Sequence, residues 1–268
     1  MPEATPLVRV AVVTFNSAAV LTEFLDRLPA AMHGLDWELV VADNGSTDDS
    51  LAIVARYGFS GTVVRMGRNA GYAAGINTAA AVPGRWGALL VVNPDVRLER
   101  GAVARLLAAL DEPGTGIAVP KLRRADGELL HTQRRRPTVM RALGEWLLGG
   151  GLAGRVAALG ETVMDAAAYE RAGVVGWASG AVQLISKACL EAAGGWDESF
   201  LLYSEETDFA LRRPTTASPP ASSRTRTAST SVARRTPRPA SGACSPRTGC
   251  CCTASATADC RPGRSGRR

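Results

Sequence analysis

Residues 38–57 read ELVVADNGSTDDSLAIVARY: a buried run, a polar turn and a helical pattern in direct succession. The β-branched opening predicts a strand, and the spacing of apolar residues over Asp49–Tyr57 predicts a helix. Between the two, Gly45 permits a tight turn, and Ser46 or Thr47 can cap the helix. A strand followed at once by a helix is the repeating unit of α/β folds with parallel sheets.

The same alternation recurs along the first 110 residues. The strand and helix pairs are Val8–Thr14 with Ala18–Leu28, Glu38–Ala42 with Asp49–Tyr57, Thr62–Arg65 with Ala73–Ala81, and Ala88–Val92 with Gly101–Leu110. They predict an α/β fold with a mostly parallel, Rossmann-like sheet and helices on both faces. Because ligands bind such sheets beyond the carboxyl ends of the strands, chemistry is expected there.

Beyond residue 120 the pattern is less regular. Residues 123–172 indicate a surface region, Val174–Ser186 is a second buried run, and Lys187–Ala193 predicts another helix. The acidic segment Trp196–Asp208 follows.

The composition changes sharply near residue 213. The chain of 268 residues carries +6, and residues 214–268 hold ten Arg against one acid, which leaves +6 − 9 = −3 for residues 1–213. This stretch has no aromatic residue and no Leu, so we expect a disordered basic tail. It holds five of the six cysteines without CxxC spacing or a histidine, which argues against zinc: Cys244, Cys250, Cys251, Cys252 and Cys260.

Two interpretations of this tail are open. One is a solvated basic arm, which would bind nucleic acid or anionic membrane without specificity. The other is a shifted reading frame, in which residues 213–225 can read Ala-Asp-His-Gly-Phe-Thr-Ala-Arg-Phe-Val-Pro-Asp-Ala, a strand and a turn. The same frame can turn residues 248–260 into an amphipathic helix. Because one frame restores both ends, a frameshift near Arg213 is the favoured hypothesis.

We expect no secretory signal before the first strand, since Glu3 and Pro6 interrupt the opening residues. No run reaches the roughly 18 to 20 apolar residues that cross a bilayer. A cytoplasmic location is therefore expected. Residues 143–159 are apolar and glycine-rich but contain Glu145 and Arg155, so they indicate a surface helix or loop, or else peripheral contact with the inner face of the cell membrane.

Three strand ends carry candidate binding residues. Asp43 can accept the N3–H of a pyrimidine base, or it can simply bond its own turn. Gly67–Asn77 is a glycine-rich turn opening a helix, which suits a phosphate or ribose, or close packing on the sheet. Asp95 follows the fourth strand, where a divalent cation would share it with a diphosphate, although a plain turn has the same residues.

The acidic segment near residue 205 suits proton transfer. Adjoining carboxylates at Glu205 and Glu206 raise one another's pKa by repulsion, which favours a general base. An acidic helix N-terminus, stabilised by the helix dipole, is the alternative.

Taken in order, these segments resemble family 2 inverting glycosyltransferases of the GT-A fold, particularly a bacterial rhamnosyltransferase branch. The resemblance covers about residues 7–212. The matching segments are Val12–Ser17, Val40–Asp48, Gly67–Asn77, Asn93–Asp95, Gly194–Glu198 and Tyr203–Asp208. Each motif is modest, but their shared order is specific.

The resemblance implies a role for each matching residue. Asp43 would read the base, and Asp95 would hold Mg²⁺ or Mn²⁺, with Asn93 standing where the family usually has a first acid. Glu206 would be the catalytic base, with Glu205 second. The nucleotide-binding residues would be Thr14, Asn16, Asp43, Asn69, Gly71 and Asn93. On the acceptor side the matching residues are Trp196, Asp197 and Asp208.

The implied reaction transfers a sugar from a nucleoside-diphosphate donor, dTDP-rhamnose or a UDP-sugar, to a saccharide or lipid-linked acceptor with inversion. It would serve cell-surface glycan synthesis, without a specific nucleic-acid partner. Residues 1–213 would form the catalytic domain, with a nucleotide-binding half at 7–120 and an acceptor half at 121–213.

The chain departs from the family after Leu211, where a strand, a histidine and covering helices are expected. We therefore predict that this chain is weakly active or inactive. One alternative is a nucleotide-sugar-binding remnant without turnover. Another is a sugar-phosphate nucleotidyltransferase, whose glycine-rich signature near the first strand is missing.

Overall fold

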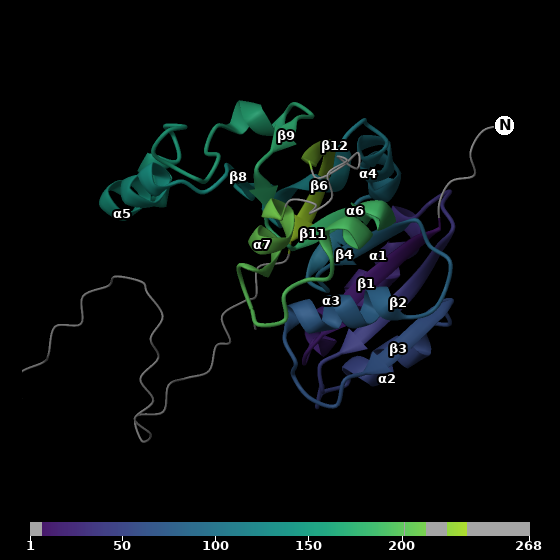
Figure 1. Ribbon diagram of the computed structural model, residues 1–268. Helices are drawn as coiled ribbons and strands as arrows, with labels where there is room; N and C mark the ends of the chain where they lie inside the picture. The colour runs from purple at the N-terminus through teal and green to yellow at the C-terminus, as the bar shows by residue number, and fades with distance from the viewer. Residues whose placement is uncertain (1–6, 201, 213–223, 235–268) are drawn as a thin grey trace, which may run out of the picture. The chain divides into compact units, whose positions relative to one another are not determined.

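The computed structural model describes residues 7–200, 202–212 and 224–234 (Figure 1). The strands are β1 Val8–Thr14, β2 Trp37–Asp43, β3 Gly61–Arg65, β4 Ala88–Val92, β5 Val96–Leu98, β6 Thr115–Arg124, β7 Leu129–Leu130, β8 Gln133–Arg134, β9 Val174–Val175, β10 Trp177–Ala178, β11 Val182–Ser186 and β12 Arg224–Arg234. The helices are α1 Ala18–Ala31, α2 Ser50–Arg56, α3 Tyr72–Ala81, α4 Ala102–Leu110, α5 Val139–Ala153, α6 Lys187–Ala193 and α7 Glu205–Leu211, with a 3₁₀ turn η1 at Ala166–Tyr169.

A ten-stranded mixed sheet organises the described residues. Its main order is β3-β2-β1-β4-β11-β6-β12-β5, with β7 paired to β6 and β9 to β12. The first four strands, β3, β2, β1 and β4, run parallel, whereas β11 is antiparallel to both β4 and β6. The predicted α/β class and mostly parallel sheet are confirmed.

The parallel half is buried on both faces because helices cover each of them. Val10 and Val12 of β1 belong to the apolar cluster that includes α1, while Ala11 and Val13 belong to the cluster that includes α3. Every residue of β1 is buried, including Arg9 and Thr14, and burial on both faces is typical of a central parallel strand.

The helix α3 lies unusually close to β1. A Cβ atom placed on Gly75 would come within 2.7 Å of both Cγ atoms of Val13. Gly71, which precedes the helix, has φ +95°, a conformation that L side chains rarely adopt. Close packing therefore accounts for Gly75 in the glycine-rich segment, and the backbone turn accounts for Gly71.

The eight predicted elements of the first 110 residues are present within three residues of their expected ends. The second buried run is broken, however, into β9, β10 and β11. Val174 is largely exposed, so burial in this run begins later than its apolar composition indicates. The predicted helix Lys187–Ala193 is found as α6.

The prediction that residues 214–268 form no part of the core is wrong for Arg224–Arg234. This segment is β12, parallel to β6 and antiparallel to β5. The compact unit that contains it runs to Thr236, past the expected boundary at residue 213. Backbone pairing with β6 does not depend on side-chain type, which explains how a polar sequence completes the sheet. The other tail residues, 213–223 and 235–268, lie outside the described residues.

Two threonines of β12 are buried between neighbouring strands, and they differ in their hydrogen bonds. Thr225 is buried, and its hydroxyl has no hydrogen-bond partner among the described residues. Thr227 is also buried, but its hydroxyl accepts a hydrogen bond of 3.0 Å from the Gly173 amide. One unsatisfied buried hydroxyl costs about 1–3 kcal/mol.

Across the ranges that the structure describes, no helix has the length and apolar character needed to cross a membrane. The longest, α5, is interrupted at Gly149, whose φ of 73° and ψ of 150° are not helical.

Candidate active site

A cavity of about 460 Å³ lies at the carboxyl ends of β1, β2 and β4, where the sheet rule places ligands. The predicted residues that line it are Asn16, Asn69, Gly71, Asn93 and Asp95. They come from three separate stretches of the chain. The topology therefore brings together most of the predicted nucleotide and metal residues.

Asp43 and Thr14 lie behind the cavity wall instead of lining it. Asp43 is buried, and its Oδ1 accepts hydrogen bonds from Thr14 Oγ1 at 2.8 Å and Ser46 Oγ at 2.6 Å. Its Oδ2 accepts one from the Ser46 amide at 3.0 Å. These bonds fix the turn after β2, as the alternative interpretation of this aspartate expects.

Asn16 ties the first two strand ends together. It has φ 50°, and its Oδ1 accepts a hydrogen bond from the Thr47 amide at 2.9 Å. Its own amide donates to Ser46 Oγ at 3.0 Å. The loops after β1 and β2 therefore form one connected edge of the cavity.

Nine lining residues were not among the predicted site residues, and four of them carry the larger side chains or reach the cavity from elsewhere: Phe15, Asn44, Tyr72 and Leu202. The first three are direct neighbours of predicted residues, so their place in the motifs was the available signal. Leu202 lies far along the sequence and gave no such signal. Phe15 is half-exposed at the cavity, an orientation that suits stacking on a planar ring.

Two cavity amides keep a buried oxygen without a hydrogen-bond partner in the described part of the chain. Asn44 Nδ2 donates to the Gly71 carbonyl at 3.0 Å, while its Oδ1 is unsatisfied. The same holds for Asn93 Oδ1. Since an orphaned buried acceptor is costly, these oxygens favour a ligand that brings donors or a cation.

Asn93 and Asp95 offer the oxygen ligands that Mg²⁺ and Mn²⁺ prefer. Among the residues described, no group of three or more His, Cys, Asp or Glu side chains could hold a metal ion. These two residues would therefore supply part of a coordination shell, and phosphate oxygens or water would complete it.

Glu205 and Glu206 begin α7 but lie in different surroundings. Glu205 is 3% exposed, and its Oε2 lacks a hydrogen-bond partner among the described residues. Burial raises the pKa of Glu205, and the neighbouring charge of Glu206 adds to the rise. Glu206 is only half-buried. The preceding residues Tyr203 and Ser204 have φ 70° and 72°, so the entry to this helix is strained.

A short turn, Gly180-Ala181, separates Glu206 from the cavity. A Cβ atom on Gly180 would lie 3.4 Å from the Glu206 Cβ. The Gly180 carbonyl accepts a hydrogen bond from the Tyr72 hydroxyl at 3.2 Å, and the Ala181 carbonyl accepts one from the Asn93 amide at 3.0 Å. Glu206 and the Asn93–Asp95 turn thus flank the same two residues at one edge of the sheet.

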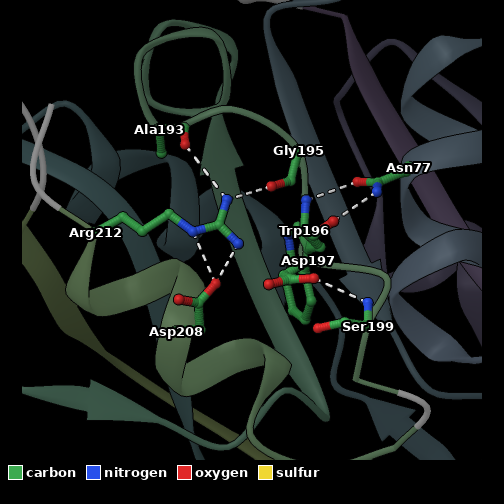
Figure 2. A network of polar contacts seen from close by, with 8 residues as sticks. All are labelled: Asn77, Ala193, Gly195, Trp196, Asp197, Ser199, Asp208 and Arg212. Atoms are coloured by element: carbon green, nitrogen blue, oxygen red, sulfur yellow. Dashed lines mark hydrogen bonds and ion pairs between the residues drawn. The ribbon is translucent and has the colours of Figure 1, made fainter. Parts of the chain in front are cut away.

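The predicted acceptor-side residues form a network beside α7 (Figure 2). Trp196 is buried, and its ring stacks on Phe209 at 5.3 Å. The Asn77 side chain holds the Trp196 backbone through two bonds of 2.8 Å, one to its carbonyl and one from its amide. Trp196 therefore anchors the loop before α7 and does not line the cavity.

Asp208 and Asp197 also hold the chain locally. Asp208 pairs with Arg212, whose guanidinium also donates to the carbonyls of Ala193 and Gly195. Asp197 accepts a hydrogen bond of 2.8 Å from the Ser199 amide, which lowers the pKa of Asp197. Neither residue lines the cavity.

Comparison with known proteins identifies the family of this chain. Residues 9–169, more than half of the chain, match the model of Glycosyl transferase family 2. The chain belongs to this family. A curated relative of this glycosyltransferase is N-acetylglucosaminyl-diphospho-decaprenol L-rhamnosyltransferase of Mycobacterium tuberculosis. The two are 28% identical over 226 residues, which is 78% of this chain and 70% of the relative.

Solved structures share the GT-A fold of this glycosyltransferase. S. aureus TarS in complex with UDP-GlcNAc is 17% identical, with a TM-score of 0.56 over 87% of this chain and 59% of that chain. Mannosyltransferase PcManGT from Pyrobaculum calidifontis, in complex with GDP-Man and Mn²⁺, is 19% identical, with a TM-score of 0.50 over 78% of this chain and 52% of that chain. The glycosyltransferase thus spans little more than half the length of these structures.

Proposed function

We propose that this glycosyltransferase transfers a sugar from a nucleoside-diphosphate donor to a lipid-linked saccharide, with inversion, in cell-surface glycan synthesis on the cytoplasmic side of the membrane. The observation that carries the proposal is the cavity at the carboxyl ends of β1, β2 and β4, with Asp95 in its wall and Glu206 across the Gly180-Ala181 turn. The name of the 28% identical relative supports L-rhamnose as the sugar and a polyprenyl diphosphate as the acceptor carrier. A UDP-sugar is the alternative donor.

The donor would lie along the strand ends. Asn16, Asn69 and Gly71 line the part of the cavity beside the first two strands, where the nucleoside would bind. Phe15 would stack on the base, and the buried pair of Asp43 and Thr14 would support that end from behind. The diphosphate would then reach Asn93 and Asp95 after β4.

The side-chain oxygens of Asn93 and Asp95 fit a divalent cation. Asp95 and the unsatisfied Asn93 Oδ1 would hold Mg²⁺ or Mn²⁺, which would neutralise charge on the departing diphosphate. Proton transfer is assigned to a side chain of the protein.

Glu206 would act as the general base. As the acceptor hydroxyl attacks the anomeric carbon, the Glu206 carboxylate takes its proton, and the bond from that carbon to the diphosphate breaks with its electron pair. Attack from the side opposite to the leaving group inverts the anomeric configuration. The partial exposure of Glu206 supports this assignment, because Glu205 is buried and so less accessible to an acceptor.

The polar sequence of β12 supports the frameshift hypothesis and the weak activity that we propose for this chain. A buried hydroxyl at Thr225 stands where the shifted frame reads alanine. Sequencing the DNA around codon 213 tests the hypothesis directly. Equal turnover by this chain and a frame-corrected version would contradict the proposed loss of activity.

Donor binding is tested by thermal shift of the frame-corrected protein with dTDP-rhamnose and UDP-sugars, each with Mn²⁺. Since a ligand that binds only the folded state raises its stability, the true donor should give the largest rise in Tm. Slow donor hydrolysis that Asp95→Ala abolishes would support an enzyme. A rise in Tm without hydrolysis or transfer would instead indicate the non-catalytic remnant.

A further inference from the structure

The helix α5 turns its apolar side chains outward. With 3.6 residues per turn, Val139, Met140, Leu143, Trp146 and Leu147 fall within an arc of roughly 120°. All five are exposed, and Trp146 is 80% exposed. A surface helix normally buries its apolar stripe against the core. This outward stripe, defined by the five residues above, indicates a contact with something other than water.

Hydrogen bonds on the inward side fix this orientation. Arg141 Nε donates to the Ala157 carbonyl at 2.9 Å. The Glu145 carboxylate accepts hydrogen bonds from the amides of Glu161 at 2.8 Å and Thr162 at 3.2 Å. The charged residues of α5 thus face the protein, so the helix cannot roll to bury the stripe without breaking these bonds.

The segment of the sequence that contains the stripe is positively charged. Residues 131–160 hold five arginines and one acid, a charge of 5 − 1 = +4, in a domain whose residues 1–213 sum to −3. The five are Arg134, Arg135, Arg136, Arg141 and Arg155. Four of them line a cavity of about 640 Å³, and within the described residues none lies at salt-bridge distance from a carboxylate. Their charge is therefore not neutralised locally.

We propose that α5 docks on the anionic surface of a lipid bilayer, with the outward stripe inserted at the boundary of headgroups and acyl chains. An amphipathic helix with apolar and aromatic residues on one side and basic residues beside it binds in this way. Trp146 at 80% exposure is the type of side chain that favours the interface, and the exposed Arg136 and Arg155 complement anionic headgroups.

Charge favours a bilayer over two other occupants. A second copy placed on the stripe by two-fold symmetry would bring two sets of the same arginines together. The segment 214–268 has no aromatic residue, no Leu and ten arginines, so it offers neither apolar area nor opposite charge. The inference does not depend on the proposed function, because vesicle binding requires no turnover. Figure 1 shows α5 on the β8 side of the sheet, away from α2 and β3.

Insertion is tested with the full chain and vesicles of phosphatidylglycerol and phosphatidylcholine whose acyl chains carry bromine. Bromine quenches only tryptophan that reaches the acyl region, so simple adsorption of the basic tail gives no signal. We expect quenching in the native chain and none in Trp146→Phe or in Leu143→Glu/Leu147→Glu. The control Val63→Glu changes an exposed residue of β3 and should keep the quenching.

The charge requirement is tested by titrating anionic vesicles against two double variants of equal charge. Arg136→Gln/Arg155→Gln should weaken binding roughly 30-fold, whereas Arg27→Gln/Arg100→Gln on another part of the surface should change it little. Equal quenching in native and Leu143→Glu/Leu147→Glu chains would overturn the proposal. A different set of results would also overturn it: light scattering shows that the native chain is a dimer, its tryptophan is not quenched by the vesicles, and Leu143→Glu/Leu147→Glu is a monomer.

Discussion

Glu205 and Glu206 are adjacent in the sequence, yet α7 directs them into different environments. Glu205 is buried beneath the helix start, and Glu206 lies beside Gly180 at the edge of the candidate active site. A carboxylate that exchanges protons with an acceptor must be accessible, and of these two side chains Glu206 is partly exposed whereas Glu205 is buried. The two side chains can therefore be distinguished by separate measurements.

Replacing Glu206 by Gln should slow sugar transfer by a factor of about 10² to 10⁴, because the proposed general base is lost. The rise in Tm caused by the donor should remain, since Glu206 does not line the cavity. Steady-state transfer and thermal shift on the frame-corrected enzyme measure the two effects. Glu191→Gln, an exposed carboxylate on α6, is the matched control and should change neither. Full activity of Glu206→Gln would remove this residue from the mechanism.

Replacing Glu205 by Gln should stabilise the protein at high pH. The pKa of Glu205 is raised in the folded state, so its ionisation penalises folding increasingly as pH rises from the unfolded value toward the folded one. The variant should gain about 2–4 °C in Tm near pH 8, and this gain should vanish toward about pH 4. Thermal melts across this range check the prediction, with Glu191→Gln as control. A gain independent of pH would contradict it.

At the scale of the element, two glycines of the segment that opens helix α3 have different surroundings. Gly71 lines the cavity, whereas Gly75 allows the helix to approach β1. Of the two interpretations that the sequence left open for this segment, close packing is confirmed at Gly75, whereas ligand binding near Gly71 stays a prediction.

Gly75→Ala should destabilise the fold by about 1–3 kcal/mol, because its Cβ would meet Val13 at 2.7 Å. Gly151→Ala is the matched control: it is also helical, has no atom within 4 Å of the added Cβ, and should gain up to about 1 kcal/mol. Urea unfolding midpoints measure both. Equal effects at the two positions would show that helix propensity, and not contact with β1, decides the outcome.

The elements that repeat a local signal could be predicted from the sequence, and those that depend on distant partners could not. The buried run of β1 and the helical pattern of α1 are visible in their own residues. β6 and β12 owe their places to backbone pairing across the sheet, and no local pattern in the polar residues of β12 announces it. In the site, Asn16 and Asp95 followed strand ends and could be found, whereas Leu202 reaches the cavity only through the tertiary fold.

Thr225→Val and Thr227→Val should have opposite effects on stability, although both residues are buried in β12. Removing the unsatisfied hydroxyl of Thr225 should stabilise the protein by about 1 kcal/mol. Removing that of Thr227 should destabilise it by about 1–3 kcal/mol, because the Gly173 amide loses its acceptor. Thermal or urea unfolding of the two variants checks the sign. Stabilisation by both would mean that β12 merely favours apolar residues.

At the scale of the molecule, β12 sets the boundary of the domain. It lies between β6 and β5 and so joins the last strands of the sheet to the rest. The charge of the chain divides near the same place, because most of the arginines of the tail follow Thr236. We therefore expect that the basic segment after Thr236 can be removed without loss of the sheet.

A chain that ends at Thr236 should keep the Tm of the full chain within about 2 °C, because it retains the whole compact unit. A chain that ends at Arg213 lacks β12 and would leave unpaired edges on β6 and β5. It should melt many degrees lower or aggregate. Thermal melts and light scattering on both truncations measure this. Equal stability of the two would show that β12 contributes nothing to the fold.

The two hydrogen bonds between the Asn77 side chain and the Trp196 backbone bear on the order in which the two substrates bind. α3 begins in the cavity wall at Tyr72, and Asn77 on the same helix holds the loop whose tryptophan rests on Phe209 of α7. A nucleotide that immobilises the start of α3 would also reduce the mobility of the helix that carries Glu206. Binding of the second substrate would then cost less conformational entropy. Kinetics with a compulsory sequence of addition, nucleotide sugar before acceptor, would follow from this single rigid connection.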